Sequence, residues 1–377
     1  MRDIATFLFE QQKKSSGEIA QEWGTLESLH NKKLWHQLTL QLQKFVKILT
    51  IHQSDALMPL YTNFIVDFEH RINPLALVEI AIPIARQIKD NLEAIEFLNK
   101  IKVKVSSDKQ AMILCLTTSG QLYMLASDME KANEIRIEAG AMVEELDGIT
   151  PVHAPFYELS SNYHRIQADH ANYYRDSLRF LGCIDLKSLS NEDQIERAFN
   201  IGLAAILGKG VYNFGELLQH DILEALKNSE KAWLVQLLFA FNSGDIKLYQ
   251  QLKTSWSKQP DLCVNETYMR QKICLLTLME MTFRRPATER SLTFAEIAKE
   301  TNLSLNEVEH LIMKALSLNL VKGSIDQVEQ VVRMTWVQPR VLDRDQIRSM
   351  AGRLQKWCDD VMSMEELVHN RALDILN

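Results

Sequence analysis

A seven-residue repeat of apolar side chains near the C-terminal end of the chain constrains its fold more than any other feature. The repeat runs from residue 347 to residue 375, with its two apolar positions spaced alternately three and four residues apart. In an α-helix this spacing places them on one stripe. The stripe consists of Ile347, Met350, Leu354, Trp357, Val361, Met364, Val368 and Ile375. We therefore predict one long helix whose stripe packs against other helices.

Two kinds of partner are open for this stripe. It can complete its core with helices of other chains, which would make the protein an assembly subunit, or it can fold back onto the domain that precedes it. Arg371 occupies a stripe position. We therefore expect the apolar contact, from which water is excluded, to end near Val368. We expect Trp357 to contribute most to binding, because large aromatic side chains dominate interface energetics.

The composition favours a mainly α-helical protein. The chain has 377 residues, of which 46 % are hydrophobic and 24 % charged, which suits two or three globular domains. Only 13 Gly and 8 Pro occur, as expected for long helices with short connections. The five Cys form no CxxC pair, so we interpret them as thiols of a protein in a reducing compartment.

From about residue 18 to residue 285, one amphipathic segment follows another. Four of these segments are separated by short polar breaks: 75–88, 92–105, 110–126 and 130–146. Paired helices of this length are typical of stacked helical hairpins, and residues 120–132 are loosely similar to a tetratricopeptide unit. Because the repeat length is irregular, a degenerate solenoid and a generic helical domain are both open, and we favour the solenoid.

The segment from Gln110 to Ser127 has no charged residue, so it could be a membrane span or a buried core helix. Its length approaches that of a membrane span, but it contains Thr, Ser, Gln and Gly. These polar and small residues favour a buried core helix. We therefore expect no membrane partner.

The pattern changes near residue 286. Thr293 precedes Glu296 by three residues, and Ser304 precedes Glu307 in the same way, which marks the start of two helices. Two runs rich in β-branched residues then flank a short polar turn and predict a hairpin. The expected elements are helices 294–300 and 305–317 and strands 320–325 and 331–337. Together they make a winged helix.

The sequence carries no signature of catalysis or of a bound cofactor. Residues 208–210 lack the spacing and the hydroxyl of a phosphate-binding loop. The 10 histidines form no HxH or HExxH pair, which a zinc-dependent protease or deubiquitinase would need. His153, His164 and His170 also lack ligand spacing, so we interpret them as structural. We expect no catalytic, cofactor-binding or metal-binding residues, and we do not expect an enzyme.

Winged helices often bind DNA, so the charge of this one matters. Residues 286–341 carry slightly more acidic than basic side chains, and the net charge of the chain is −7. The helix that would enter a DNA groove has Glu307 and Glu309 near its start, where Arg, Lys or Asn is normally needed. We therefore expect a protein-binding winged helix without a nucleic-acid partner. A nucleic-acid-binding protein is the less favoured alternative.

Seven stretches have sequences long enough to compare with known families. They are KKLWHQLTLQ (32–41), FEHR (68–71), SLRFLGC (177–183), NFGELL (213–218), AFNSG (240–244), LMEMTF (278–283) and MTWVQPRVL (334–342). The order of helical repeats, winged helix and long C-terminal helix resembles that of PCI-domain proteins. From about residue 32 to the end, the sequence resembles the family of the 26S proteasome non-ATPase regulatory subunit 13.

This resemblance implies a non-catalytic scaffold of the proteasome lid, in cytoplasm and nucleus, that supports lid assembly and ATP-dependent degradation of ubiquitinated proteins. It implies other PCI subunits as partners, bound through the winged helix and a shared bundle of C-terminal helices. It also implies a helical arm near the ubiquitin-receptor side of the regulatory particle. A PCI scaffold of the signalosome or of translation initiation factor three is the alternative.

On this interpretation the chain has two binding surfaces. One is the heptad stripe, and the other is the edge of the hairpin, with Lys322, Gly323 and Val331 as candidate contact residues. An exposed strand edge can extend the sheet of a neighbour. The expected domains are a helical-repeat domain (32–285), a winged helix (286–341) and a C-terminal helix (342–377), after an N-terminal segment (1–31) of unclear role.

Overall fold

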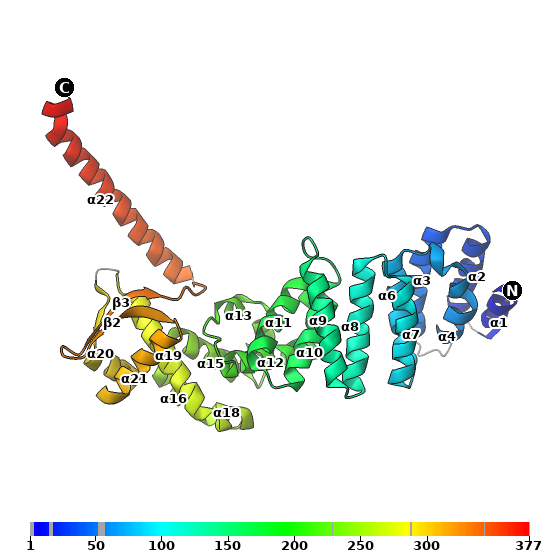
Figure 1. The fold of residues 1–377 in the computed structure, drawn as a ribbon, viewed down its shortest axis with the longest axis horizontal. Helices are drawn as coiled ribbons and strands as arrows, with labels where there is room; N and C mark the ends of the chain where they lie inside the picture. Colours follow the sequence, from blue (N-terminus) through cyan, green and yellow to red (C-terminus); the bar gives the residue numbers. More distant parts are fainter. Residues whose placement is uncertain are drawn as a thin grey trace. The chain divides into compact units, whose positions relative to one another are not determined.

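The computed structural model describes residues 4–14, 18–51, 57–227, 229–286, 289–342 and 344–376. The chain divides into two compact units, residues 1–185 and residues 186–377. Figure 1 shows the helices and strands of both units. The division falls inside the segment 32–285 that was expected to form one helical-repeat domain, so the later helices of that segment cluster with the winged helix.

All the regular elements described in the first unit are helices or helical turns. The elements are α1 (Ile4–Lys14), α2 (Glu18–Asn31), α3 (Trp35–Ile51), α4 (Leu57–Leu60), the π-helical turn η1 (Tyr61–Ile65), α5 (Val66–Phe68), the 3-10 turn η2 (Glu69–Arg71), α6 (Pro74–Gln87), α7 (Asn91–Lys104), α8 (Lys109–Leu125), α9 (Met129–Glu144), α10 (His153–Ile166) and α11 (His170–Cys183). From α6 to α11 each helix packs against the next (Figure 1). These stacked hairpins confirm the predicted helical-repeat fold.

Short polar side chains begin these helices. Asp90, Asp108 and Asp128 each accept a hydrogen bond from a backbone N–H in the first turn of α7, α8 and α9. Asn73 and Asp169 do the same for α6 and α11. A cap of this kind stabilises a helix by about 1 kcal/mol. The polar breaks in the sequence are therefore N-caps, and the four predicted helices differ from the observed ones by about one or two residues at each end.

Helix α8 carries the uncharged run and is a core helix. Its buried residues include Gly120, where an added Cβ would lie 2.9 Å from the side chain of Leu159 on α10. This close approach favours glycine, because a larger residue would displace the Leu159 side chain. Among the residues that the structure describes, no helix has the length and apolarity needed to cross a membrane.

The N-terminal segment, whose role the sequence left open, contributes to the core of the first unit. Leu8 of α1 and Trp23 and Leu26 of α2 are buried in the same cluster as residues of α3 and α6. The Trp23 ring meets Phe45 of α3 edge to face, with 4.8 Å between ring centroids. The described helices of residues 1–31 are therefore part of the helical domain.

The second unit combines helices with a small sheet. Its elements are η3 (Leu186–Ser188), α12 (Asn191–Leu207), α13 (Gly215–Gln219), α14 (Ile222–Lys227), α15 (Ala232–Ser243), α16 (Ile246–Gln251), α17 (Lys253–Trp256), α18 (Pro260–Val264), α19 (Glu266–Arg284), β1 (Ser291–Thr293), α20 (Phe294–Thr301), α21 (Leu305–Ser317), β2 (Val321–Asp326), β3 (Val331–Val337) and α22 (Arg344–Leu376).

The predicted winged helix is confirmed, with one addition. Both predicted capping pairs are present, since Thr293 N–H donates to Glu296 and Ser304 N–H donates to Glu307. The sheet is antiparallel in the order β1-β3-β2. The sequence predicted the β2–β3 hairpin and missed β1, because three residues are too short to show a strand periodicity.

Helix α19 is anchored to α12 by a buried lysine. The Lys272 side chain is only 1 % exposed. Its Nζ donates to the carbonyl oxygens of Ala205, Ile206 and Gly208, at 2.8 Å, 2.9 Å and 2.9 Å. Burial lowers the pKa of Lys272 to about 7. The three carbonyls at the end of α12 favour the charged form, because only an ammonium has three N–H donors.

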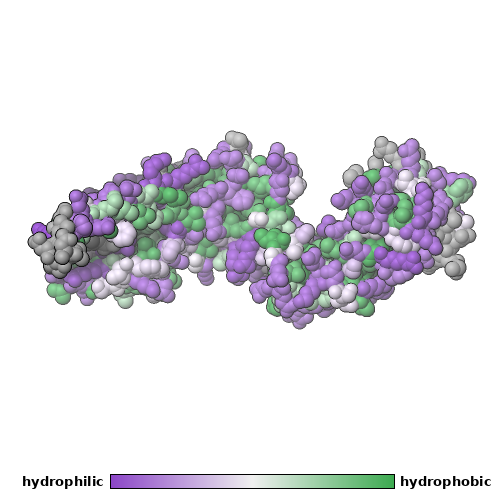
Figure 2. All heavy atoms as spheres, turned by 90° about the horizontal axis from the view of Figure 1, so that it is seen from above, coloured by the Kyte–Doolittle hydropathy of each residue, from purple (hydrophilic) through white to green (hydrophobic). Residues whose placement is uncertain are grey.

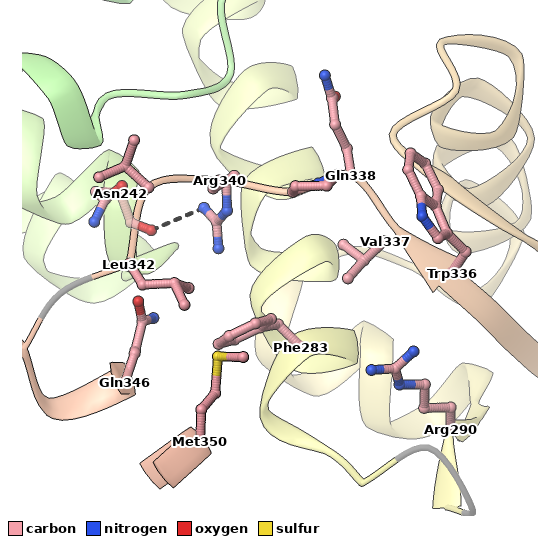
Figure 3. Close-up of a pocket in the computed structure, with 12 residues that line it drawn as sticks. Asn242, Phe283, Arg290, Trp336, Val337, Gln338, Arg340, Leu342, Gln346 and Met350 are labelled. Carbon is pink, nitrogen blue, oxygen red and sulfur yellow. Dashed lines mark hydrogen bonds between the residues drawn. The ribbon is translucent and has the colours of Figure 1, made fainter. Parts of the chain in front are cut away.

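Residues 338–342, which we call the strap, connect β3 to α22 and are bound to α19 and α15. The Arg340 guanidinium donates to the Glu280 carboxylate of α19, and both side chains are at most 10 % exposed. The same guanidinium donates to the carbonyl oxygen of Asn242 at 3.1 Å, as the dashed line in Figure 3 shows. The strap therefore holds the start of α22 close to α19.

The strap also contacts α13. The Val341 N–H donates to Asn213 Oδ1 at 3.2 Å, and the Gln219 side chain donates to the Leu342 carbonyl oxygen at 3.1 Å. A Cβ on Gly215 would lie 2.5 Å from the Cβ of Val341 and 2.9 Å from its carbonyl oxygen. The stretches 213–218, 240–244, 278–283 and 334–342, which carry part of the family resemblance, thus contribute to the strap or to its contacts.

We predict that Gly215→Ala displaces the strap and destabilises the second unit. The added methyl group has no room beside Val341, and overpacking of this kind costs about 1–3 kcal/mol. Gly352→Ala is the matched control, because no atom lies within 4 Å of the position of its added Cβ. Urea unfolding of both variants measures the difference. Equal stability would show that the strap moves without cost.

We predict that Lys272→Met destabilises the protein by about 2 kcal/mol or more. Methionine fills similar volume but leaves three buried carbonyl oxygens without their donor, at about 1–3 kcal/mol for each unsatisfied group. Lys258→Met, at an exposed position, should be neutral. Thermal unfolding at pH 6 compares them. If Lys272→Met were as stable as the parent protein, the free-energy cost of burying the amine would equal the stabilisation from its three hydrogen bonds.

Candidate interaction surfaces

The predicted stripe lies on α22 and is open to solvent. Its described side chains, from Ile347 to Val368, are between 40 % and 64 % exposed, and Trp357 is the most exposed of them. All the described side chains of α22 are exposed except the half-buried Gln346. Ile375 lies outside the residues whose side chains the structure describes. From Leu354 to Val368 the stripe therefore does not pack on its own winged helix, whereas Met350 lines a pocket together with Phe283 of α19 and Val337 of β3.

Two further apolar side chains are exposed on α22, and the sequence analysis overlooked them. Met362 and Leu367 are 56 % and 47 % exposed. At 100° per residue, Leu367 borders the stripe next to Met364 and widens it, whereas Met362 lies about 130° from the local midline of the stripe. A strict two-position stripe suits a pair of helices, whereas a wider apolar arc suits a bundle of several. The heptad pattern concealed these residues, because both fall outside its two apolar positions.

The hairpin presents one free strand edge among the described residues. In the order β1-β3-β2, strand β2 pairs only with β3. Lys322 and Gly323 are exposed on β2, and the Lys322 ammonium lies 5.0 Å from the centroid of the Trp336 ring. Val331 belongs to the central strand, where it pairs with Thr293 and with Asp326. Its half-buried side chain is available for contact, but its backbone is already paired on both sides.

Gly323 occupies an irregular position of this edge. The register between β2 and β3 shifts between Lys322 and Gly323. A Cβ on Gly323 would lie 2.3 Å from the carbonyl oxygen of Arg333. Glycine is therefore required by the bulge itself, which bends the exposed strand at this point.

Helix α21 has carboxylates where a DNA-reading helix would need donors. Hydrogen bonds from Ser304 lower the pKa of Glu307 below its ordinary value, so this carboxylate is ionised at neutral pH. Glu309 accepts a hydrogen bond from Gln327. Lys314 donates to Gln271 of α19 at 2.7 Å. The face of α21 is acidic at its start, and its lysine is already bound, which disfavours contact with phosphates.

Ser160, His164 and Asp176 lie close together but are not arranged as a catalytic triad. Ser160 donates its hydroxyl hydrogen to Asp176 at 2.7 Å, and His164 Nε2 lies 3.6 Å from the same carboxylate. Burial lowers the pKa of His164, although Asp176 opposes that shift. A serine nucleophile would instead donate to the histidine. The described residues contain no cluster of three or more His, Cys, Asp or Glu side chains able to hold a metal ion.

Hydrophobic residues reach the surface elsewhere too. On the face drawn in Figure 2, hydrophilic residues predominate and hydrophobic ones emerge between them in several patches. Isolated exposed apolar residues are ordinary. The regular row on α22 differs, because its members share one helix face.

Comparison with known proteins accounts for nearly the whole chain. Residues 22–238 match the family model described as PSD13 N-terminal repeats. Residues 249–336 match the PCI domain model. The first match spans α2 to α15, and the second spans α19, the winged helix and most of the sheet.

Full-length relatives agree with these matches. The chain is 37 % identical to the 26S proteasome non-ATPase regulatory subunit 13 of Dictyostelium discoideum, over 97 % of this chain and 96 % of the relative. It is 38 % identical to homolog B of that subunit in Arabidopsis thaliana (93 % and 94 %), and 34 % identical to the 26S proteasome regulatory subunit RPN9 of Saccharomyces cerevisiae (93 % and 92 %). With two family models and relatives of this coverage, the chain belongs to the family of the 26S proteasome non-ATPase regulatory subunit 13.

Proposed function

We propose that this protein is a non-catalytic scaffold subunit of the lid of the 26S proteasome regulatory particle. It supports lid assembly and, through it, the ATP-dependent degradation of ubiquitinated proteins. The single observation that carries the proposal beyond family membership is the exposed apolar stripe of α22. An exposed apolar row on a subunit of this family is best explained by burial against other chains of the complex.

The energetics of the stripe are adequate for this role. Fully burying an aliphatic or aromatic side chain contributes about 1.5–3 kcal/mol. Association costs about 4–15 kcal/mol in lost freedom of motion. The seven described stripe residues, together with Leu367, can exceed that cost. Trp357, as the largest and most exposed, is the proposed centre of the contact.

The second proposed contact is the β2 edge. Strand β2 has unpaired backbone groups on its outer side, and a neighbouring PCI domain can continue the sheet there. Lys322, Gly323 and the side chain of Val331 are the candidate contact residues. The bulge at Gly323 limits this pairing to a short segment, since bulges end regular pairing.

The partners we propose are the other PCI subunits of the lid, through the winged helix and a shared bundle of C-terminal helices. The helical arm would face the ubiquitin-receptor side of the particle, and the site of action would be the cytoplasm and the nucleus. The five cysteines are all free thiols, which accords with a reducing compartment.

The alternatives are weaker. A PCI scaffold of the signalosome or of translation initiation factor three would share this fold, but the relatives that span the whole chain favour the proteasome. A nucleic-acid-binding winged helix is disfavoured by the ionised Glu307 and by the net charge of −7.

We predict that Trp357→Asp leaves the monomer folded and impairs its incorporation into the lid. The side chain is 64 % exposed, so the change in folding stability should stay within about 0.5 kcal/mol. Loss of a central aromatic contact should weaken binding by about 2 kcal/mol, roughly 30-fold. Titration of the variant into a purified lid assembly that lacks this subunit measures the loss.

Lys356→Asp is the control for that variant, because it places the same residue one position away, off the apolar stripe. It should bind like the parent protein. If Trp357→Asp melted early or lost helical circular dichroism, the stripe would belong to the core of the monomer and the proposal would fail.

We predict that a chain ending at Leu342 keeps its fold and loses most of its lid binding. Affinity purification of the tagged full chain and of the truncated chain, followed by mass spectrometry, tests this. If both versions recover lid subunits equally, the stripe is dispensable for assembly. If neither recovers them, the assignment to the lid is wrong.

A further inference from the structure

A cavity of about 310 Å³ lies where α22 begins. Its walls are Phe283 of α19, Trp336 and Val337 of β3, the strap, and Gln346 and Met350 of α22. Figure 3 shows the Met350 side chain reaching from α22 toward Phe283. A volume of this size matches the lower range of ligand pockets and holds a large apolar side chain. The cavity is therefore a place where a second molecule can insert.

One polar atom of a lining residue lacks a hydrogen-bond partner among the described residues. Arg290 donates from one terminal nitrogen to the carbonyl oxygen of Thr335 at 3.4 Å. Its Nε is buried and has no hydrogen-bond acceptor among the described residues. The buried Nε has almost no accessible surface, so an acidic group that enters the cavity would meet the terminal nitrogens of the guanidinium instead. A carboxylate is the acceptor that best fits them.

The charge of the lining selects an acidic partner. Among the residues that the structure describes, the lining contains two cations, Arg290 and Arg340, and no Asp or Glu. Arg340 is already bound to Glu280 and to the carbonyl oxygen of Asn242. Within the described part of the chain, Arg290 is therefore the cation of the lining without a carboxylate partner, and an incoming acidic group would be drawn to it.

The cavity is continuous with the stripe of α22. Met350 is a stripe residue that is 40 % exposed, and it also lines the cavity. The next stripe residue, Leu354, follows one turn later on the same face of the helix. A partner helix that packs along the stripe as far as Met350 would therefore lie beside the cavity.

We propose that this cavity receives a large apolar side chain from the helix of another subunit that packs along the stripe. That helix carries an Asp or Glu within one turn of the inserted residue, and its carboxylate binds Arg290. The inference rests on the proposed function, since it assumes that α22 packs against helices of other subunits. The inserted side chain and its neighbouring carboxylate would fix how far the partner helix is shifted along α22.

The first test reverses the charge at position 290. Arg290→Glu should raise the dissociation constant of the full chain for a purified lid assembly that lacks this subunit by at least about tenfold. Arg290→Gln should cause a smaller loss, and it serves if the glutamate variant does not fold. Lys299→Glu is the matched control, an exposed lysine on α20 of the same winged helix, and should change the constant less than twofold.

The second test identifies the occupant. A photoreactive benzoylphenylalanine at position 350, in the assembled particle, should cross-link to a helical segment of another subunit that contains a large apolar residue and an Asp or Glu within four positions. Replacing that acidic residue by Arg should restore binding of Arg290→Glu. This charge swap would not rescue a variant that had merely lost stability.

The outcomes separate this inference from the proposed function. If Trp357→Asp abolishes binding while both Arg290 variants bind like the parent protein, the cavity has no such occupant and the stripe acts alone. If position 350 cross-links to a segment without an acidic residue, the inference is equally overturned. If neither Trp357→Asp nor the Arg290 variants weaken binding, the proposed function itself fails.

Discussion

The ion pair between Arg340 and Glu280 holds together the parts of the second unit on which its proposed function depends. Two buried charges are favourable only if their remaining hydrogen-bonding groups are also satisfied. Here Glu280 also accepts from Arg284, and Arg340 also donates to the carbonyl oxygen of Asn242. The carboxylate belongs to α19 and the guanidinium to the strap. The pairing therefore ties the start of α22 to the helix that precedes the winged helix.

In the second unit, the strap is bound to packed helices, whereas the helix that follows it, α22, is exposed. Lys272 anchors α19 to the end of α12, and Gly215 allows the strap to lie directly on α13. Beyond the strap, α22 presents apolar side chains to solvent. A helix that must meet partners at a defined place gains from a fixed base, because less conformational freedom is lost on binding. The fold thus suits a subunit whose work is to position others.

Much of this fold could be predicted from local sequence. Asp90, Asp108 and Asp128 mark helix starts because a side-chain oxygen can cap only the helix that follows it. The heptad of α22 is visible because its period is carried by large apolar residues. Strand β1 was missed because three residues carry no period. Met362 and Leu367 were missed because they lie outside the heptad positions, although their spacing is present in the sequence.

The sequence by itself determined the helical repeats, the winged helix and the long final helix, since capping, periodicity and β-branched runs act over a few neighbouring residues. Only the tertiary structure decided that Arg340 pairs with Glu280, that Lys272 binds the carbonyls at the end of α12, and that Arg290 Nε has no acceptor among the described residues. Each of these depends on groups dozens of residues apart or on a cavity formed by several elements. Their proximity results from packing, which no local pattern encodes.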